Sequence, residues 1–421
     1  MPTDVGIVGA GYVGLPLAVE FGRAGRTVVC VDTDTRRVDA IGRGESYIED
    51  VDGQALASVV EAGAVSATSD YAALADAGAI LICLPTPLSQ NREPDLTVLT
   101  SATKQIVRHL RPSHLVVLES TTYPGTTREV LLPILESGGL RGGADFHLAM
   151  SPERIDPGRA DYTVRTTPKV IGGLTDACRD RAIDLYSACI DRLVPVSSCD
   201  AAELTKLLEN IFRSVNIALV NELAMLCHRM GLNVWEVVDA AATKPYGFMP
   251  FAPGPGLGGH CLPIDPFYLS WKAREYDFPV EFIELAGKVN QNMPYHCADR
   301  IALALNGAQK PVSGSTVVIL GVAYKGGVGD LRESPALKVM ELLAAQGAAL
   351  AYHDPFVPSL AEHGFALDSE PLTDELLASA DIVAVVTAHP GVDHARVGEV
   401  APLVIDFRNA VPAADGRVVK L

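Results

Sequence analysis

Short apolar runs alternate with amphipathic helical patterns over the first part of the chain. We expect strands at residues 5–8 and 27–31, with a helix over 15–25 between them. Further buried strands are expected at residues 79–83, 115–118 and 147–150. Continuous apolar strands separated by helices are typical of a parallel sheet that is covered on both faces.

The middle of the chain has one long helical pattern instead, from about Asp200 to Met230. Apolar residues lie nearly all round this helix, so we expect it to be buried, between domains or against another subunit. The pattern consists of Leu204, Leu207, Leu208, Ile211, Phe212, Val215, Leu219 and Leu223. Gly231 is a suitable C-cap, and a loop dense in glycine and proline follows at residues 253–261.

The last part of the chain returns to the strand–helix alternation of the first. A helix is expected from Ser334 to Gln346, with strands at residues 316–320, 349–352, 382–386 and 403–406. We therefore predict the α/β class, with two Rossmann-like doubly wound parallel-sheet domains joined by a central long-helix domain. The predicted boundaries are residues 1–198, 199–300 and 311–421.

Composition and charge narrow the functional classes. The chain of 421 residues has 34 Lys and Arg against 51 Asp and Glu, a net charge of −17 that argues against nucleic acid or an anionic membrane as partner. It has no apolar run near the ~20 residues of a membrane span and no signal-like start, so we expect a cytoplasmic protein. Eight scattered cysteines without a C-x-x-C pair indicate neither a disulfide framework nor a metal site.

A glycine-rich turn follows the first expected strand. Gly9, Gly11 and Gly14 stand in a G-x-G-x-x-G pattern that opens a helix, and the second strand ends in Asp32. This pattern suits a tight turn, close approach to a pyrophosphate and a carboxylate on the adenosine ribose, which favours NAD. Arg37 keeps NADP open, because an arginine accommodates a 2′-phosphate. The alternative is a tight turn without a ligand.

One cysteine differs from the others in its surroundings. Cys261 follows Gly-Gly-His, whose glycines let the backbone approach a substrate, and Asp265 lies four residues further on. A helix start there would lower the pKa of the thiol. A reactive thiol and a structural one are both open on these residues alone. His260 fits a structural hydrogen bond better than a general base. Cys30, Cys83, Cys189 and Cys227 are expected in cores.

Polar residues interrupt the long helix. Lys206 and Asn210 lie one turn apart on one face, with Arg213 near it. Polar groups on a buried face need partners, so these residues are candidates for a site. The alternative is an internal salt-bridge network that includes Glu203 and Glu209.

Two further polar segments follow apolar strands. Glu153, in the segment Ser151–Arg154, lies at the carboxyl end of a strand, where α/β sheets bind ligands, and is a candidate acid or base. The segment Ser120–Thr122 has the equivalent place after another strand, although helix capping before Thr126 explains it equally well.

Cations flank a glycine-rich turn in the last part of the chain. Tyr324, Lys325 and Arg332 follow the strand at residues 316–320. On so acidic a chain, they indicate a phosphate-bearing ligand. Surface solvation is the alternative.

Taken together, the chain resembles the UDP-glucose/GDP-mannose dehydrogenase family of nucleotide-sugar 6-dehydrogenases over essentially its whole length. Several motifs in one order carry this resemblance: the residues at 9–16, 84–87, 120–122, 151–154, 202–206, 258–261, 324–325 and 330–334.

The resemblance implies a four-electron oxidation of the C6 alcohol of a sugar to a carboxylate, with two NAD+. Cys261 would form a thiohemiacetal and then a thioester, Lys206 and Asn210 would polarise the C6 oxygen, and Asp265 and Glu153 would handle protons and water. Thr121 would assist through its hydroxyl.

The resemblance also implies the binding residues and partners. Those for NAD are Gly9, Gly11, Tyr12, Val13, Gly14, Asp32, Arg37, Thr86, Pro87, Thr121 and Arg332. Those for the nucleotide sugar are Glu153, Arg154, Lys206, Asn210, Gly254, Gly256, Gly258, Gly259, Tyr324, Lys325 and Arg408. The nucleotide sugar is a UDP-sugar or a dTDP-sugar. The long helix predicts a homo-oligomer, a dimer first of all.

Two departures bear on the substrate. Ile264 stands where the glucose-oxidising branch typically has lysine, so the loop motifs are nearest those of UDP-N-acetylhexosamine 6-dehydrogenases. Bacterial glucose-specific members with similar loops exist, which leaves UDP-glucose open as the substrate. Gly327 and Gly329 replace acidic residues usual in the family, which leaves uridine and thymidine open. A single-step NAD-dependent hydroxyacid dehydrogenase is the rival enzyme, but it gives no use to Cys261 or to the last hundred or so residues. A binding protein without turnover is the rival class.

Overall fold

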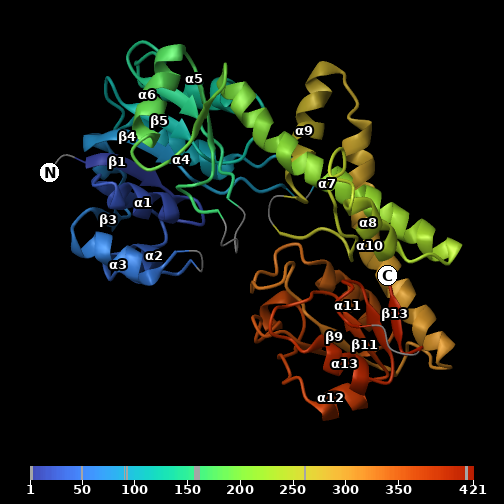
Figure 1. Cartoon of the computed structure of the whole chain (residues 1–421). Coiled ribbons are helices and arrows are strands. Elements are labelled where there is room, and N and C mark those ends of the chain that lie inside the picture. Colours follow the sequence, from blue (N-terminus) through green and yellow to red (C-terminus); the bar gives the residue numbers. More distant parts are fainter. Residues whose placement is uncertain are drawn as a thin grey trace. The chain divides into compact units, whose positions relative to one another are not determined.

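The computed structural model describes residues 3–48, 51–89, 91, 93–155, 162–259, 262–412 and 416–421. The chain divides into two compact units (Figure 1). The N-terminal unit contains residues Met1–Glu209 and Phe267–Phe278, and the C-terminal unit contains Asn210–Pro266 and Pro279–Leu421. The predicted division into three domains stays a prediction, because the helical middle of the chain contributes to both units.

A single sheet forms the centre of the N-terminal unit. Among the described residues it has eight strands in the order β3-β2-β1-β4-β5-β6-β7-β8. They are β1 (Thr3–Val8), β2 (Val28–Val31), β3 (Val65–Thr68), β4 (Ala77–Ile82), β5 (Leu115–Leu118), β6 (His147–Met150), β7 (Lys169–Gly173) and β8 (Leu193–Pro195). The strands are parallel except that β7 runs antiparallel to β6.

Helices cover both faces of this sheet. Alternate residues of one strand belong to different cores: Ile7 packs in one with α1 and α3, and Val8 in the other with α4 and α5. The helical elements are α1 (Gly14–Arg23), α2 (Thr35–Gly42), α3 (Gly53–Glu61), η1 (Tyr71–Asp76), α4 (Thr97–Val107), η2 (Thr126–Leu131), α5 (Leu132–Glu136) and α6 (Asp176–Tyr186). The predicted doubly wound sheet is confirmed.

The long helix is α7 (Cys199–Met230), close to its predicted bounds, and the chain itself buries only part of its apolar surface. Leu207 and Ile211 are buried, whereas Leu208, Phe212 and Leu219 are about half exposed. The apolar residues of α7 therefore form two faces, and only one of them packs against the rest of the chain.

The C-terminal unit contains the second sheet. In the described part of the chain it has five parallel strands in the order β10-β9-β11-β12-β13. They are β9 (Thr316–Leu320), β10 (Ala349–His353), β11 (Ile382–Val385), β12 (Val404–Asp406) and β13 (Val418–Lys420). Residues of β9 alternate between two cores, so this sheet is also covered on both faces. The predicted strands at 316–320, 349–352, 382–386 and 403–406 are confirmed to within one residue.

The remaining helices lie around the second sheet and after α7. They are α8 (Val234–Ala242), α9 (Asp265–Ala273), η3 (Arg274–Tyr276), α10 (Glu281–Gly307), α11 (Pro335–Ala345), η4 (Ala361–His363), α12 (Asp374–Ser379) and α13 (His394–Val400). Among the residues described, no helix is both long enough and apolar enough to span a bilayer.

Candidate functional site

The turn between β1 and α1 is built for close approach of a ligand to the backbone. Gly9 has a φ of 95°, and a Cβ on Gly14 would lie 1.9 Å from the carbonyl oxygen of Gly9. A Cβ on Gly11 would meet nothing within 4 Å. Gly9 and Gly14 are therefore needed for the turn itself, whereas Gly11 opens its backbone outward. Tyr12 and Val13 follow it, the latter as the N-cap residue of α1.

Asp32 lies directly after β2 and is fixed beside this turn. Its Oδ2 atom accepts hydrogen bonds from the backbone of Ala10 at 2.9 Å and from Arg37 at 3.3 Å. Its Oδ1 atom accepts one from the backbone of Asp34 at 2.9 Å. A carboxylate held at the end of the second strand, next to an open glycine turn, fits the ribose and pyrophosphate of a dinucleotide.

Loops from the carboxyl ends of β4 and β5 are tied together at the same edge of the sheet. The Thr86 hydroxyl donates to the carbonyl oxygen of Thr121 at 2.7 Å, and the Tyr268 hydroxyl donates to that of Thr86 at 2.6 Å. A weaker contact of 3.3 Å joins Tyr268 to Pro87. The structure thus brings three of the predicted cofactor residues to the edge where parallel sheets bind ligands.

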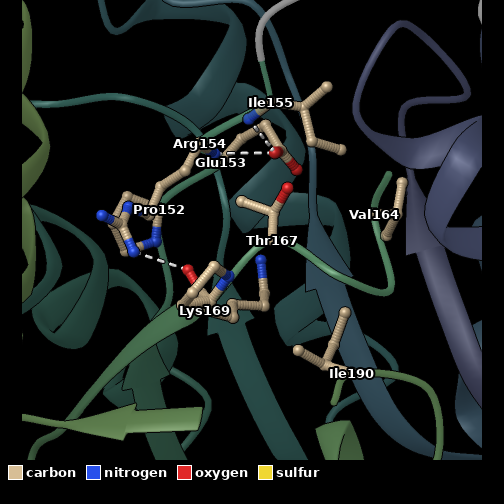
Figure 2. Close-up of a pocket in the computed structure, with 9 residues that line it drawn as sticks. Pro152, Glu153, Arg154, Ile155, Val164, Thr167, Lys169 and Ile190 are labelled. Carbon is tan, nitrogen blue, oxygen red and sulfur yellow. Dashed lines mark hydrogen bonds between the residues drawn. The ribbon is translucent and has the colours of Figure 1, made fainter. Parts of the chain in front are cut away.

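Glu153 lies in the segment that follows β6, on the wall of a small pocket (Figure 2). Its Oε1 atom accepts hydrogen bonds from the backbone of Arg154 and Ile155, both at 2.7 Å. The Arg154 side chain turns to Glu209, with an ion pair of 2.7 Å, and lines the same pocket. Glu153 is thus held by two backbone donors at the end of a strand.

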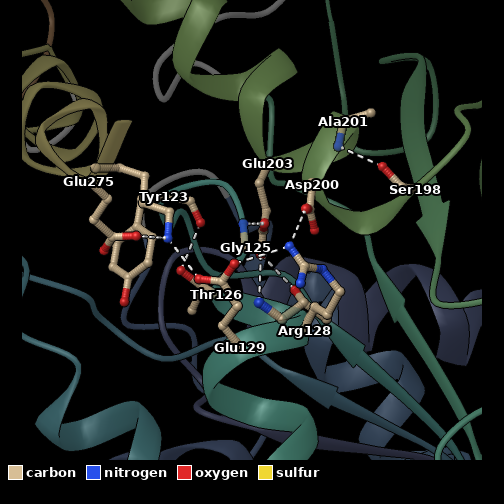
Figure 3. A network of polar contacts seen from close by, with 12 residues as sticks. Tyr123, Gly125, Thr126, Arg128, Glu129, Ser198, Asp200, Ala201, Glu203 and Glu275 are labelled. Atoms are coloured by element: carbon tan, nitrogen blue, oxygen red, sulfur yellow. Dashed lines mark hydrogen bonds and ion pairs between the residues drawn. The ribbon is translucent and has the colours of Figure 1, made fainter. Parts of the chain in front are cut away.

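The loop after β5 is anchored by Glu203, which lies on α7 (Figure 3). The Glu203 carboxylate accepts hydrogen bonds from the backbone of Gly125 at 2.6 Å and from the backbone and hydroxyl of Thr127 at 2.8 and 2.7 Å. Of the salt bridges considered for the long helix, Glu209 forms one and Glu203 binds these uncharged donors instead. Burial raises the pKa of Glu203 to about 7, against the effect of these donors.

Lys206 is buried on α7, one turn after Glu203, in the N-terminal unit. Asn210 and Asp265 belong to the C-terminal unit, where the Asn210 amide donates to the Asp265 carboxylate at 2.5 Å. Asp265 is the first residue of α9, so a helix does begin just after the loop that carries Cys261. Cys261 and His260 themselves lie outside the described residues.

The glycine loop before Cys261 packs against the start of the second sheet domain. A Cβ on Gly254 would lie 2.6 Å from the Arg408 guanidinium, and one on Gly258 would lie 2.5 Å from Tyr324. A Cβ on Gly259, whose φ is 83°, would lie 3.0 Å from the ring of Tyr324, and its N–H donates to the carbonyl oxygen of Arg332 at 2.9 Å. Tyr324 and Arg408, two of the predicted nucleotide-sugar residues of this unit, therefore lie against this loop.

Two buried asparagines anchor the beginning of that loop. The side-chain oxygen of Asn221, on α7, accepts from the backbone of Gly254 at 2.9 Å, and its amide donates to Asn290 of α10 at 3.0 Å. Gly256, with a φ of 130°, passes the carbonyl oxygen of Asn290 so closely that a Cβ would lie 3.0 Å from it. The loop thus lies against both long helices of this unit.

A buried Asp–His pair shapes the turn after β9. His389 Nε2 donates to Asp354 at 2.9 Å, and its Nδ1 atom accepts from the backbone of Gly327 at 3.2 Å. Burial acts to raise the pKa of Asp354, but hydrogen bonds from His389 and the backbone hold this pKa below its ordinary value. Lys325 lies in this turn, and Arg332 at its end pairs with Asp330 at 2.6 Å. Gly327 thus gives the turn its shape through its backbone.

Sequence reasoning missed several of these polar residues. Asn221, Asn290, Asp354 and His389 carry no motif, and only their burial and hydrogen bonds mark them. Glu119, which accepts a hydrogen bond from Lys169, was also missed, although its position directly after the continuous apolar strand β5 could have marked it. The described cysteines are Cys30, Cys83, Cys178, Cys189, Cys199, Cys227 and Cys297, and all are buried and unpaired, as expected for core residues.

Comparison with known proteins shows the family of the chain. Sequence models of the UDP-glucose/GDP-mannose dehydrogenase family match the chain with their NAD-binding domain at residues 3–190, their central domain at 200–292 and their UDP-binding domain at 318–413. The chain is 34% identical over 414 residues to a UDP-N-acetyl-D-mannosamine dehydrogenase of Pyrococcus horikoshii, covering 97% of this chain and 96% of the relative. It is 37% identical over 355 residues to a UDP-N-acetyl-D-glucosamine 6-dehydrogenase of Pseudomonas aeruginosa, covering 84% and 83%.

A solved structure of a UDP-D-ManNAc dehydrogenase from Pyrococcus horikoshii superimposes with a TM-score of 0.91 at 33% identity, covering 99% of this chain and 98% of that one. The chain therefore belongs to the UDP-glucose/GDP-mannose dehydrogenase family and is an NAD-dependent UDP-sugar dehydrogenase.

Proposed function

We propose that the protein oxidises the C6 hydroxymethyl group of a UDP-N-acetylhexosamine to the carboxylate, with two NAD+ per sugar. The observation that carries this proposal is the similarity over 97% of the chain to a relative named for UDP-N-acetyl-D-mannosamine, together with the second relative named for UDP-N-acetyl-D-glucosamine. Ile264, which replaces the lysine typical of glucose-oxidising members, supports the same choice. A dTDP-hexose is the alternative nucleotide sugar.

The glycine loop of the C-terminal unit is the proposed binding place of the nucleotide sugar. Tyr324 and Arg408 pack against Gly254–Gly259, and Lys325 lies in the turn after β9. Arg408 and Lys325 give this region local positive charge, although the net charge of the chain is −17. A diphosphate therefore has partners here even though the whole molecule is acidic.

In the proposed reaction, Lys206 and Asn210 hold the C6 oxygen and stabilise negative charge on it. The glycine turn and Asp32 would hold NAD+, which would supply the hydride acceptor for both oxidations. After the first, the Cys261 thiolate adds to the aldehyde carbon, and the resulting thiohemiacetal carries a C–H bond that can be oxidised like that of an alcohol. The second oxidation leaves a thioester.

Hydrolysis then requires a base and a leaving thiolate. Glu153 takes a proton from water as the water oxygen bonds to the thioester carbon, and the C–S bond to Cys261 breaks. Asp265, which accepts the hydrogen bond of Asn210 at 2.5 Å, orients that amide and takes part in proton transfer. Thr121 supplies a hydroxyl beside the cofactor. The balance is one alcohol, one water and two NAD+ giving one carboxylate, two NADH and three protons.

The number of NADH released per sugar tests the reaction. With limiting UDP-N-acetylmannosamine or UDP-N-acetylglucosamine we expect about two NADH per sugar, whereas a single-step hydroxyacid dehydrogenase releases one. UDP-glucose and dTDP-glucose in the same assay compare the alternative sugars. Cys261→Ser is expected to stop release of the acid while allowing at most slow partial oxidation. Normal multiple turnover by this variant would refute the thioester route.

We further propose that the protein is a homodimer in which the outer face of α7 is covered by the second copy. In the C-terminal unit Phe212, Leu219, Leu223 and Leu226 recur on one side of this helix and are between 38% and 56% exposed. A row of exposed apolar residues on one side of a helix is typical of protein–protein interfaces. A cytoplasmic location, expected from the sequence, fits the proposed supply of NAD and nucleotide sugars.

A further inference from the structure

A buried ion pair lies behind Glu153, and the proposed reaction gives it no role. Glu119, the residue after β5, has its side chain fully buried, and Lys169, at the start of β7, is 6% exposed. The Lys169 ammonium lies 2.6 Å from Glu119 Oε2. The hydroxyl of Tyr186, on α6, donates to Glu119 Oε1, and Lys169 Nζ lies 5.0 Å from the centre of the Tyr186 ring.

This pair faces the same pocket as Glu153. Lys169 and Glu153 both line this small pocket, with Thr167 between them (Figure 2). Although burial acts to lower it, the charges of Glu119 and Glu153 raise the pKa of Lys169, so its ammonium keeps its proton. Among the described residues, the other titratable groups that bear on Glu119 are Tyr186, Cys83 and Cys189, and all three are buried.

A buried ion pair between lysine and glutamate adds little to the stability of the fold, because the desolvation of both groups offsets most of their attraction. A buried cation close to a carboxylate that must accept a proton has a direct use, since it favours the charged form of that carboxylate. The backbone N–H groups of Arg154 and Ile155 fix the orientation of Glu153. Uncharged donors stabilise the ionised form of a carboxylate less than a full cation does.

We propose that Lys169 is a positioning residue for the hydrolytic step: its ammonium, held in place by Glu119 and Tyr186, keeps Glu153 ionised as the base that accepts the proton of water. This proposal rests on the role of Glu153 in the proposed function. Lys169 itself touches neither substrate nor cofactor in this account, and Glu119 and Tyr186 act only through Lys169.

The acid limb of the pH profile of kcat separates this role from a purely structural one. Lys169→Met removes the cation, so the limb is expected to move to higher pH by about one unit. Lys169→Arg keeps the charge and is expected to restore the position of the limb. Glu119 is the counter-ion of Lys169, so removal of its negative charge does not weaken the effect of the cation on Glu153. Glu119→Gln is therefore expected to leave the limb in place or lower it.

Lys272 offers a matched control in the same unit. It is also a buried lysine with two carboxylate partners, Glu129 at 2.7 Å and Glu275 at 2.6 Å, but it belongs to another network (Figure 3). Lys272→Met is expected to leave the acid limb where it is. If Lys169→Met folds poorly, the double variant Lys169→Met/Glu119→Gln leaves no buried unpaired charge and is expected to show the same upward shift.

A measurement without turnover keeps this proposal distinct from the proposed function. With glutamate labelled by 13C at the side-chain carboxyl, the Glu153 signal is the one that Glu153→Gln removes, and its titration is followed by NMR in wild type and in Lys169→Met. We expect the midpoint to rise in Lys169→Met and to return in Lys169→Arg. An unmoved midpoint, or equal upward movement in Glu119→Gln, overturns the proposal even if wild type releases two NADH per sugar. Absence of turnover with a shifted midpoint instead contradicts the proposed function alone.

Discussion

At the scale of single residues, Glu203 combines a structural task with a titratable group. It joins the start of α7 to the loop after β5 through Gly125 and Thr127, three residues before Lys206. All its partners here are donors, so an amide in its place would direct its NH2 group at a donor. A lost partner of this kind costs about 1–3 kcal/mol. Glu203 is therefore expected to fix where Lys206 lies.

Its titration makes the stability of the N-terminal unit depend on pH. Burial raises the pKa of Glu203 from 4.5 to about 7, so the folded state binds this proton more tightly than the unfolded chain does. The stabilisation from this proton is complete below pH 4.5 and is lost as pH rises through 7, which amounts to about 3 kcal/mol. We expect the advantage in apparent Tm of wild type over Glu203→Gln to fall between pH 5 and pH 8. An advantage that grows over this range would show that the donors outweigh burial.

At the scale of elements, two glycines of the turn between β1 and α1 are expected to have different roles, Gly14 in folding and Gly11 in cofactor binding. A Cβ on Gly14 collides with the Gly9 carbonyl oxygen at 1.9 Å, whereas one on Gly11 meets nothing within 4 Å. Gly14→Ala is expected to lower the apparent Tm, because α1 can no longer pack against β1. Gly11→Ala is expected to keep the Tm but weaken NAD+ binding at least tenfold, because the methyl group occupies the approach of the pyrophosphate. Isothermal titration calorimetry with NAD+ measures this. Unchanged affinity in Gly11→Ala would place the pyrophosphate elsewhere.

The elements that the sequence predicts are those whose own residues carry the signal. The strand at residues 147–150 and the helix near Asp200–Met230 are long or apolar enough to be recognised from their pattern. The short strands β3 and β13 were missed, because Val65–Thr68 and Val418–Lys420 are stabilised by pairing with a neighbouring strand. The Asn221–Asn290 pair was also missed, because its two residues lie on separate helices that come together only in the fold.

At the scale of the whole molecule, the exposed apolar residues of α7 concern more than the single chain. The sequence predicts that this helix is buried between domains or against another subunit, and the chain itself covers only the side with Leu207 and Ile211. Periodicity reports that a residue is to be buried and says nothing of which chain buries it. The exposed row on α7 is therefore the observation on which the proposed dimer rests.

The dimer can be tested by charging that row. Wild type is expected to have twice the mass of the 44.6 kDa chain in sedimentation or light scattering at micromolar concentration. Leu219→Glu/Leu223→Glu places two carboxylates where two copies of α7 would meet, so it is expected to give a folded monomer by desolvation and like-charge repulsion. Val98→Glu, which charges an equally exposed apolar residue on α4, is the control and is expected to stay dimeric. A monomeric wild type, or a dimer that survives both glutamates, would mean that another partner or another face covers α7.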